Sequence, residues 1–182
     1  MIKSKFILFL LFILASNAFS SVDTESSVKY VSDLILKIPF SENQVEKDEI
    51  LNKIKEIKNK NPSNTSIFNM YINALVSNKK YSQALLEMDA VKDTGKNDEI
   101  YLLKCMLKDR LEEMSHECYN SFIKTKEQHN KKDVDYIMAL YLSGSDKYKA
   151  AKEEYIKNSS LSGDFDLIES KKPKEILLEF FP

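Results

Sequence analysis

The stretch Tyr81–Ser82–Gln83–Ala84–Leu85 carries the pattern that organises this chain: after a polar turn come a tyrosine, two spacer residues and a small residue. The same unit returns as Tyr148–Lys149–Ala150–Ala151, so its small residue recurs 67 positions later, and Cys118 lies at the midpoint. Counting back 34 positions from Ala84 reaches Ile50. A bulky residue follows each of these four anchors by four positions: Ile54, Met88, Phe122 and Tyr155. The sequence therefore has an internal repeat with a period of about 34 residues.

Hydrophobic residues recur at steps of three and four along most of the chain, which is typical of amphipathic helices. The clearest stretches are Val28–Ile38, Ile50–Ile57, Phe68–Leu75 and Tyr81–Val91. Prolines follow the first two stretches, at positions where a helix has to end. With three glycines, four prolines and no tryptophan, the chain lacks the turn residues that a β-sandwich or barrel needs. The sequence predicts an all-α fold.

A helix-turn-helix unit of this length resembles the tetratricopeptide repeat (TPR) family. Residues 66–92, 100–126 and 133–158 are similar to its pairs of A and B helices, and residues 28–60 to a degenerate first copy. The interlocking positions of the family pattern are filled by Phe68, Tyr71, Ala84 and Met88. Where the family has a small residue in the A helix, only Ala139 conforms, while Ile72 and Met106 depart from the pattern. The resemblance implies a right-handed α-solenoid of three to four TPR-like helix-turn-helix repeats with a C-terminal capping helix.

The N-terminus has the pattern of a secretory signal peptide, with Lys3 and Lys5 before ten apolar residues from Phe6 to Ala15. Cleavage after Ser20 is expected, and cleavage after Ala18 is the alternative. Ten apolar residues are half of the roughly 20 that a membrane helix needs. We therefore expect a soluble mature form without a membrane span, located in the periplasm or secreted. The predicted parts are a signal peptide (1–20), N-terminal helices (21–62), TPR-like repeats (63–162) and a C-terminal cap (163–182).

The charged residues exclude several function classes. The formal net charge is −1, so no basic field is available to hold nucleic acid. The chain has 26 lysines and one arginine, Arg110, whereas phosphate sites favour the planar fork of arginine. Its two histidines, His116 and His129, lie outside any metal-binding motif, and the sequence has no glycine-rich phosphate loop. We predict no catalytic residues, metal or cofactor, and a protein that is not an enzyme.

Two cysteines suggest a covalent link within one repeat. In the TPR register, Cys105 lies on the inner face of an A helix and Cys118 at the small-residue position of the following B helix. These positions face each other across a helical hairpin, at a separation that a disulfide can bridge. Export to an oxidising compartment favours this bond. Two alternatives remain open: a pair of buried free thiols, or a metal site with His116, which is two residues from Cys118 and not on the same helix face.

TPR arrays bind extended or helical segments along the concave surface of their A helices, so the resemblance implies a partner-binding face. The residues expected there are Asn69, Asn73, Leu103, Leu107, Arg110, Tyr136 and Leu140. Asparagines can bond a peptide backbone, and the apolar residues can hold an apolar side chain. The alternative is that the N-terminal helix or the Phe180–Phe181 tail of the chain itself fills this groove.

Together these patterns predict an exported helical-repeat protein that binds another protein. One setting is an immunity protein, which masks the active site of a toxin delivered into the periplasm. The other is an adaptor or assembly subunit of an envelope or secretion complex. An immunity protein predicts one tight partner, and an adaptor predicts several partners in a lasting assembly.

Overall fold

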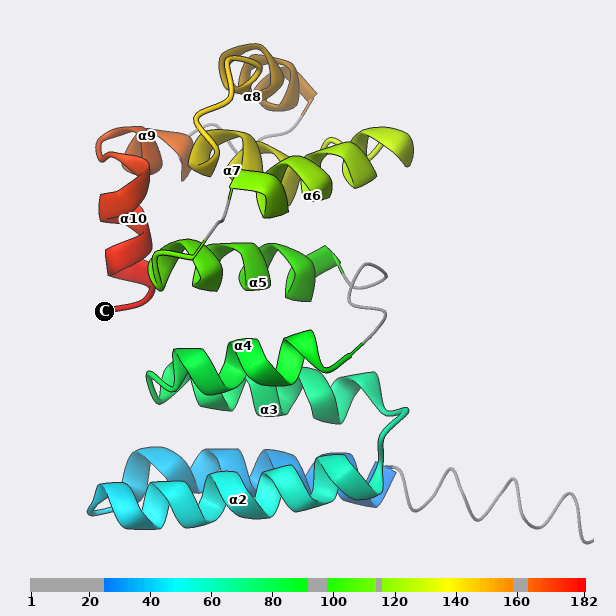
Figure 1. Cartoon of the computed structure of the whole chain (residues 1–182), viewed down its shortest axis with the longest axis vertical. Coiled ribbons are helices and arrows are strands. Elements are labelled where there is room, and N and C mark those ends of the chain that lie inside the picture. The colour runs from blue at the N-terminus through cyan, green and yellow to red at the C-terminus, as the bar shows by residue number, and fades with distance from the viewer. Residues whose placement is uncertain (1–24, 92–97, 114–115, 159–163) are drawn as a thin grey trace, which may run out of the picture. The chain divides into compact units, whose positions relative to one another are not determined.

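The computed structural model of the chain describes residues 25–91, 98–113, 116–158 and 164–182 (Figure 1). All regular structure in these ranges is helical, which confirms the predicted all-α class. The chain divides into two compact units, Met1–Leu75 and Val76–Pro182, and each is described by itself. The predicted signal peptide, residues 1–20, lies outside the described residues. No helix within the described ranges is both long and apolar enough to cross a bilayer.

Unit 1 consists of a helical hairpin followed by a third helix. A helix over residues 25–37 leads into the short 3-10 helix η1 (Ile38–Phe40), then come α2 (Gln44–Lys60) and α3 (Thr65–Ser77), whose last two residues belong to unit 2. Pro39 lies in the first turn of η1, where its missing N–H is tolerated. The buried side chains of this unit are Val31, Leu34, Ile38, Leu51, Ile54, Ile67, Tyr71, Ile72, Ala74 and Leu75.

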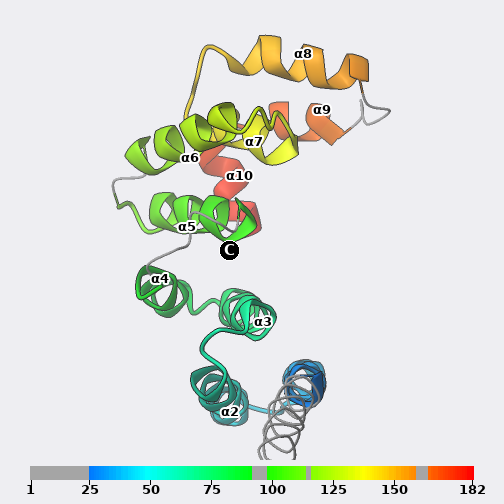
Figure 2. The same cartoon turned by 90° about the vertical axis from the view of Figure 1, so that its right-hand side faces the viewer.

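Unit 2 is a succession of shorter helices. They are α4 (Tyr81–Asp89), α5 (Asp98–Arg110), α6 (His116–Gln128), α7 (Val134–Leu142), α8 (Tyr148–Asn158), α9 (Asp164–Glu169) and α10 (Pro173–Phe180). Consecutive helices pack on one another from α4 to α8, and α5 also packs directly on α7. The last helix packs against both α5 and α7 and runs across them rather than alongside (Figures 1 and 2).

Helix positions agree closely with the sequence pattern. The predicted pairs at residues 66–92, 100–126 and 133–158 correspond to α3 with α4, α5 with α6, and α7 with α8. The predicted capping segment contains two helices, α9 and α10. The period of hydrophobic residues therefore locates the helices, because each helix buries one stripe of its surface.

Candidate partner-binding surfaces

The residues predicted to bind a partner do not form one exposed face. Leu107 and Leu140 are completely buried and Tyr136 is nearly so, which places all three in the core of unit 2. Leu103 and Arg110 are partly exposed in the same unit. In unit 1, Asn69 is partly exposed and has an interaction partner, and Asn73 is exposed.

Arg110 contacts the C-terminal tail of the chain. Its Nε donates a hydrogen bond of 2.7 Å to the main-chain oxygen of Phe181. The hydroxyl of Tyr81, on α4, donates one of 3.0 Å to the main-chain oxygen of Pro182. The Arg110 guanidinium lies 5.8 Å from the centre of the Tyr81 ring, within range of a cation–π interaction. Arg110, a predicted partner contact, thus binds the C-terminal tail of the chain itself.

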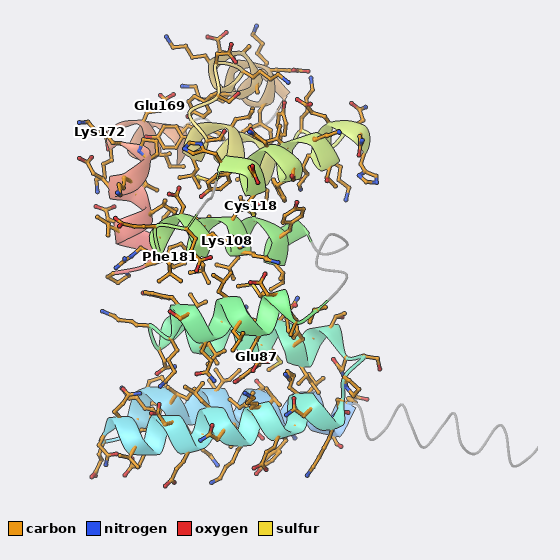
Figure 3. The ribbon with its side chains drawn as sticks, viewed as in Figure 1. Glu87, Lys108, Cys118, Glu169, Lys172 and Phe181 are labelled. Carbon is orange, nitrogen blue, oxygen red and sulfur yellow. A yellow bond between two sulfur atoms is a disulfide. The ribbon has the colours of Figure 1, made fainter. Side chains whose placement is uncertain are left out.

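Phe181 completes this cluster, which we call the tail clamp: Tyr81, Arg110 and Phe181. The ring of Phe181 meets that of Tyr81 edge to face, with centroids 5.8 Å apart, and both side chains are buried. Figure 3 shows Phe181 beyond the C-terminal end of α10, beside α5. An aromatic pair of this geometry contributes about 0.5–1.5 kcal/mol beyond its buried area. The clamp thus joins three elements, α4, α5 and the tail.

The sequence contains a partial signal for this cluster. Arg110 is the one arginine among 27 basic residues, and the TPR register predicts it at a binding face. For Tyr81 the repeat pattern predicts only a position at the start of a repeat helix. Its contact with Pro182 spans 101 positions, and no local pattern predicts a pairing at that distance.

Helix α10 presents apolar side chains on two sides. Ile176 and Leu177 are buried, whereas Leu178 and Phe180 are 50% and 48% exposed. The N-terminus of the helix is fixed locally, since the backbone N–H of Lys172 donates to Glu175 Oε2 at 2.9 Å. One side of α10 is therefore buried against the other helices of unit 2, and the opposite side leaves apolar surface exposed.

A second apolar surface lies at the turn of the unit 1 hairpin, and we call it the hairpin tip: Leu36, Phe40 and Val45. These side chains are 64%, 85% and 67% exposed. Leu36 and Phe40 fall outside the stripe formed by Val31, Leu34 and Ile38, so the helix period does not direct them to the core. This mismatch with the helix period is visible in the sequence, yet none of the three residues is among the predicted contacts.

Hydrogen bonds hold the hairpin tip in one conformation. Asn43 caps α2 by accepting from the backbone N–H of Glu46 at 3.0 Å. The Glu46 carboxylate in turn accepts from the backbone N–H of Glu42, the residue before the cap, at 2.9 Å and from the side-chain amide of Asn43 at 3.3 Å. The N–H of Ser41 donates to the oxygen of Ile38 at 3.2 Å. These bonds fix the connection between the helix that carries Leu36, the 3-10 helix that ends at Phe40 and the first turn of α2, where Val45 lies.

Tyr136, predicted to bind a partner, takes part in a polar network between α6 and α7. Its hydroxyl donates to Glu127 at 3.1 Å, and Lys147 donates to the same carboxylate at 2.8 Å. Burial and the bond to Glu127 raise the pKa of Tyr136 to about 12. The bond from Lys147 lowers the pKa of Glu127. The Tyr136 side chain is thus bound within unit 2.

A buried lysine also links α6 to α7. Lys126 is 1% exposed, and its ammonium donates to Asp133 at 2.7 Å and lies 3.8 Å from Asp135. Asp133 also caps α7 by accepting from the N–H of Tyr136 at 3.1 Å. Buried charges are retained when they are paired in this way. This network holds α6 and α7 together.

The predicted disulfide between Cys105 and Cys118 is confirmed. The sulfurs are bonded, the Cα atoms are 5.4 Å apart, and the bond joins α5 to α6. It excludes both alternatives, since neither thiol is free. His116 opens α6, and the described residues contain no group of three or more potential metal ligands.

Comparisons with known proteins find no relative of this chain. No family model matches it, no curated protein is detectably similar in sequence, and no solved structure is detectably similar in fold. A function therefore has to be inferred from the surfaces described above.

Proposed function

We propose that this chain is an exported, non-catalytic helical-repeat protein that binds a protein partner, and that the hairpin tip makes the contact. The observation that carries the proposal is the exposure of Leu36, Phe40 and Val45 on the helical segments that flank a hydrogen-bonded turn. Leaving one such side chain in water forgoes about 1.5–3 kcal/mol of burial. Clustered exposed apolar residues commonly mark contact sites.

A protein is a better match to this surface than an anionic membrane or nucleic acid. Among residues 36–49 the exposed charged side chains are Lys37, Glu42 and Glu49, so acids outnumber bases there and an anionic surface would be repelled on balance. A protein pocket can receive the Phe40 ring while its rim pairs with these acids. The expected partner surface is an apolar pocket with a basic rim.

The repeat architecture is part of the proposal. Within unit 2, packing of α5 on α6, of α7 on α8, and of α5 directly on α7 supports a TPR-like stack in which the A helices of two neighbouring repeats touch. The disulfide supports export, because such bonds persist in oxidising compartments. The basic and apolar N-terminal sequence supports a cleaved signal peptide and a periplasmic or secreted location.

Two biological settings fit a dedicated protein binder of this kind. As an immunity protein, the chain would place the hairpin tip against a toxin and block its active site. As an adaptor, it would join components of an envelope or secretion complex. The half-exposed Leu178 and Phe180 on α10 favour the adaptor as the second candidate, since they provide apolar surface on unit 2 as well.

Affinity capture from the source cells, followed by reconstitution with the purified partner, tests the proposal. Phe40→Ser should raise the dissociation constant at least ten-fold, which is a loss of about 1.4 kcal/mol of binding free energy. The matched control is Leu86→Ser, which alters a 69% exposed leucine on α4 of unit 2. Equal affinities for the Phe40 variant and the original chain would contradict the proposal. One partner whose toxicity is blocked would identify an immunity protein, and several partners in one assembly would identify an adaptor.

A further inference from the structure

We propose that Cys118 is the site of thiol–disulfide exchange in this protein. A thiol oxidoreductase with a reactive cysteine pair makes and breaks the Cys105–Cys118 bond through a mixed disulfide on Cys118. Cys105 is then the buried sulfur that resolves this intermediate. The site lies on unit 2 and is independent of the hairpin tip.

Cys105 lies in the interior of unit 2. Its side chain is completely buried, and the helix that carries it, α5, packs on α4, α6, α7 and α10. A thiolate attacks a disulfide sulfur in line with the S–S bond, from the side away from the sulfur that leaves. A thiolate that attacks Cys105 would therefore have to enter on the side of its sulfur away from Cys118, within this packed interior.

Cys118 lies at the margin of the buried face of α6. The buried residues of this helix are Tyr119, Phe122, Ile123 and Lys126, which have the spacing of one helical stripe. Cys118 lies beside the stripe and is partly exposed, and Figure 3 shows it between α6 and α5. An in-line attack on Cys118 comes from the side away from Cys105 and α5. The partly exposed margin of α6 is therefore where a thiolate has to arrive.

Each exchange step conserves atoms and electrons. In reduction, a thiolate of the reduced oxidoreductase attacks Cys118 Sγ and forms a bond to it, while the electron pair of the old bond leaves on Cys105 Sγ, which takes up a proton. The second thiolate of the oxidoreductase then attacks its own partner sulfur and releases Cys118 as a thiolate. Oxidation is the reverse sequence, in which the disulfide of the oxidoreductase accepts two electrons and Cys105 closes the bond by attacking Cys118.

Contacts other than the disulfide keep the two sulfurs together while the bond is open. The rings of Tyr101 and Phe122 meet edge to face with their centroids 5.4 Å apart, and the Tyr119 hydroxyl donates to Asp109 at 3.3 Å. Both contacts join α5 to α6. Because Cys105 thus stays beside the mixed disulfide, the closing step is intramolecular and is favoured over attack by a second external thiol.

The test compares the two thiols one at a time in the folded full chain. Cys105→Ala leaves Cys118 as the only thiol, and Cys118→Ala is the matched variant that leaves Cys105. With oxidised glutathione as the probe, Cys118 should form the mixed disulfide faster than Cys105 by a factor of about ten or more. In urea that unfolds both variants the two rates should become similar, because the difference comes from burial. Equal rates in the folded chains, or faster reaction of Cys105, would overturn the inference.

A measurement on the unaltered chain gives an answer even if either variant does not fold. The intact disulfide is treated with reduced glutathione without denaturant, the reaction is quenched with acid at intervals, and peptide mass mapping locates the adduct. Glutathione should be found on Cys118, with Cys105 as the free thiol. An adduct on Cys105, equal adducts on the two cysteines, or no adduct on either would contradict the assignment of Cys118 as the exchange site.

Discussion

The two units differ in how far their apolar side chains are exposed: those of the hairpin tip in unit 1 are exposed, whereas Phe181 in the tail of unit 2 is buried. On unit 2, the chain folds its own tail onto α5 and α7 and buries Phe181 in the clamp with Tyr81 and Arg110. On unit 1, Phe40 remains 85% exposed in a turn that is held by hydrogen bonds. Arg110, a predicted contact, thus binds the chain's own tail, while the exposed apolar side chains of unit 1 lie outside the predicted site.

The largest effect should come from Leu107, a predicted contact that lies in the core. We expect Leu107→Asp to cost more than about 4 kcal/mol, because it buries an unpaired carboxylate. Loss of the helical circular dichroism of unit 2 at room temperature would be the readout. Leu86→Asp is the control and should unfold near the temperature of the unaltered chain. A folded Leu107 variant would mean that this position is accessible after all.

Reduction of the disulfide should have the next largest effect. Opening a loop of 13 positions removes about 3 kcal/mol in the chain-entropy model. Urea unfolding with and without reductant measures this difference directly. The double variant Cys105→Ala/Cys118→Ala should match the reduced chain and show no response to reductant. A response in that variant would point to an effect of the reductant other than on this bond.

Removal of the clamp arginine should have an intermediate effect on stability. Arg110→Ala loses a charged hydrogen bond to the tail, and such bonds contribute about 1.5–3 kcal/mol. Arg110→Lys keeps the charge but lacks the planar guanidinium fork, so it should recover only part of the loss. Thermal unfolding of both variants separates charge from geometry. Full recovery by lysine would show that the guanidinium geometry at Phe181 is unimportant.

Tyr136 should have a smaller effect that depends on pH. Tyr136→Phe removes the bond to Glu127 and should cost about 1 kcal/mol near neutral pH. The folded-state pKa is raised to about 12, so the contribution is complete below pH 10 and is lost as the pH rises through the folded value. Stability measured from pH 9 to 12 should fall less steeply in the variant. Parallel curves would contradict the assignment of this titration to Tyr136.

The smallest effect on stability belongs to the hairpin tip. Phe40→Ser should change the free energy of unfolding by no more than about 0.5 kcal/mol, as is usual for exposed positions. The same substitution should sharply weaken partner binding. Denaturant unfolding, with partner binding assayed in parallel, checks both statements. A destabilisation of about 2 kcal/mol or more would mean that Phe40 is packed and that the tip is not an open surface.

The sequence predicts those features that recur locally along the chain. The 34-residue period locates the helix pairs, and the TPR register places Cys105 opposite Cys118, because both depend on the regular spacing of residues on helices. The position of the tail cannot be found this way, since Arg110 and Phe181 are 71 positions apart and their pairing depends on how α10 turns back. Leu107 and Leu140 lie on α5 and α7, which pack on each other and on further helices of unit 2, and both side chains are fully buried. Leu36 and Phe40 are absent from the predicted site, because the pattern of buried stripes carries no information on apolar residues outside them.

Hydrogen exchange on the full chain, free and with its captured partner bound, tests the central claim most directly. The account predicts that the partner slows exchange over residues 36–45, at the hairpin tip, and that Phe40→Ser removes this protection. Unchanged exchange over residues 36–45, with the partner bound at saturation, would contradict the claim that the hairpin tip is the surface through which this protein acts.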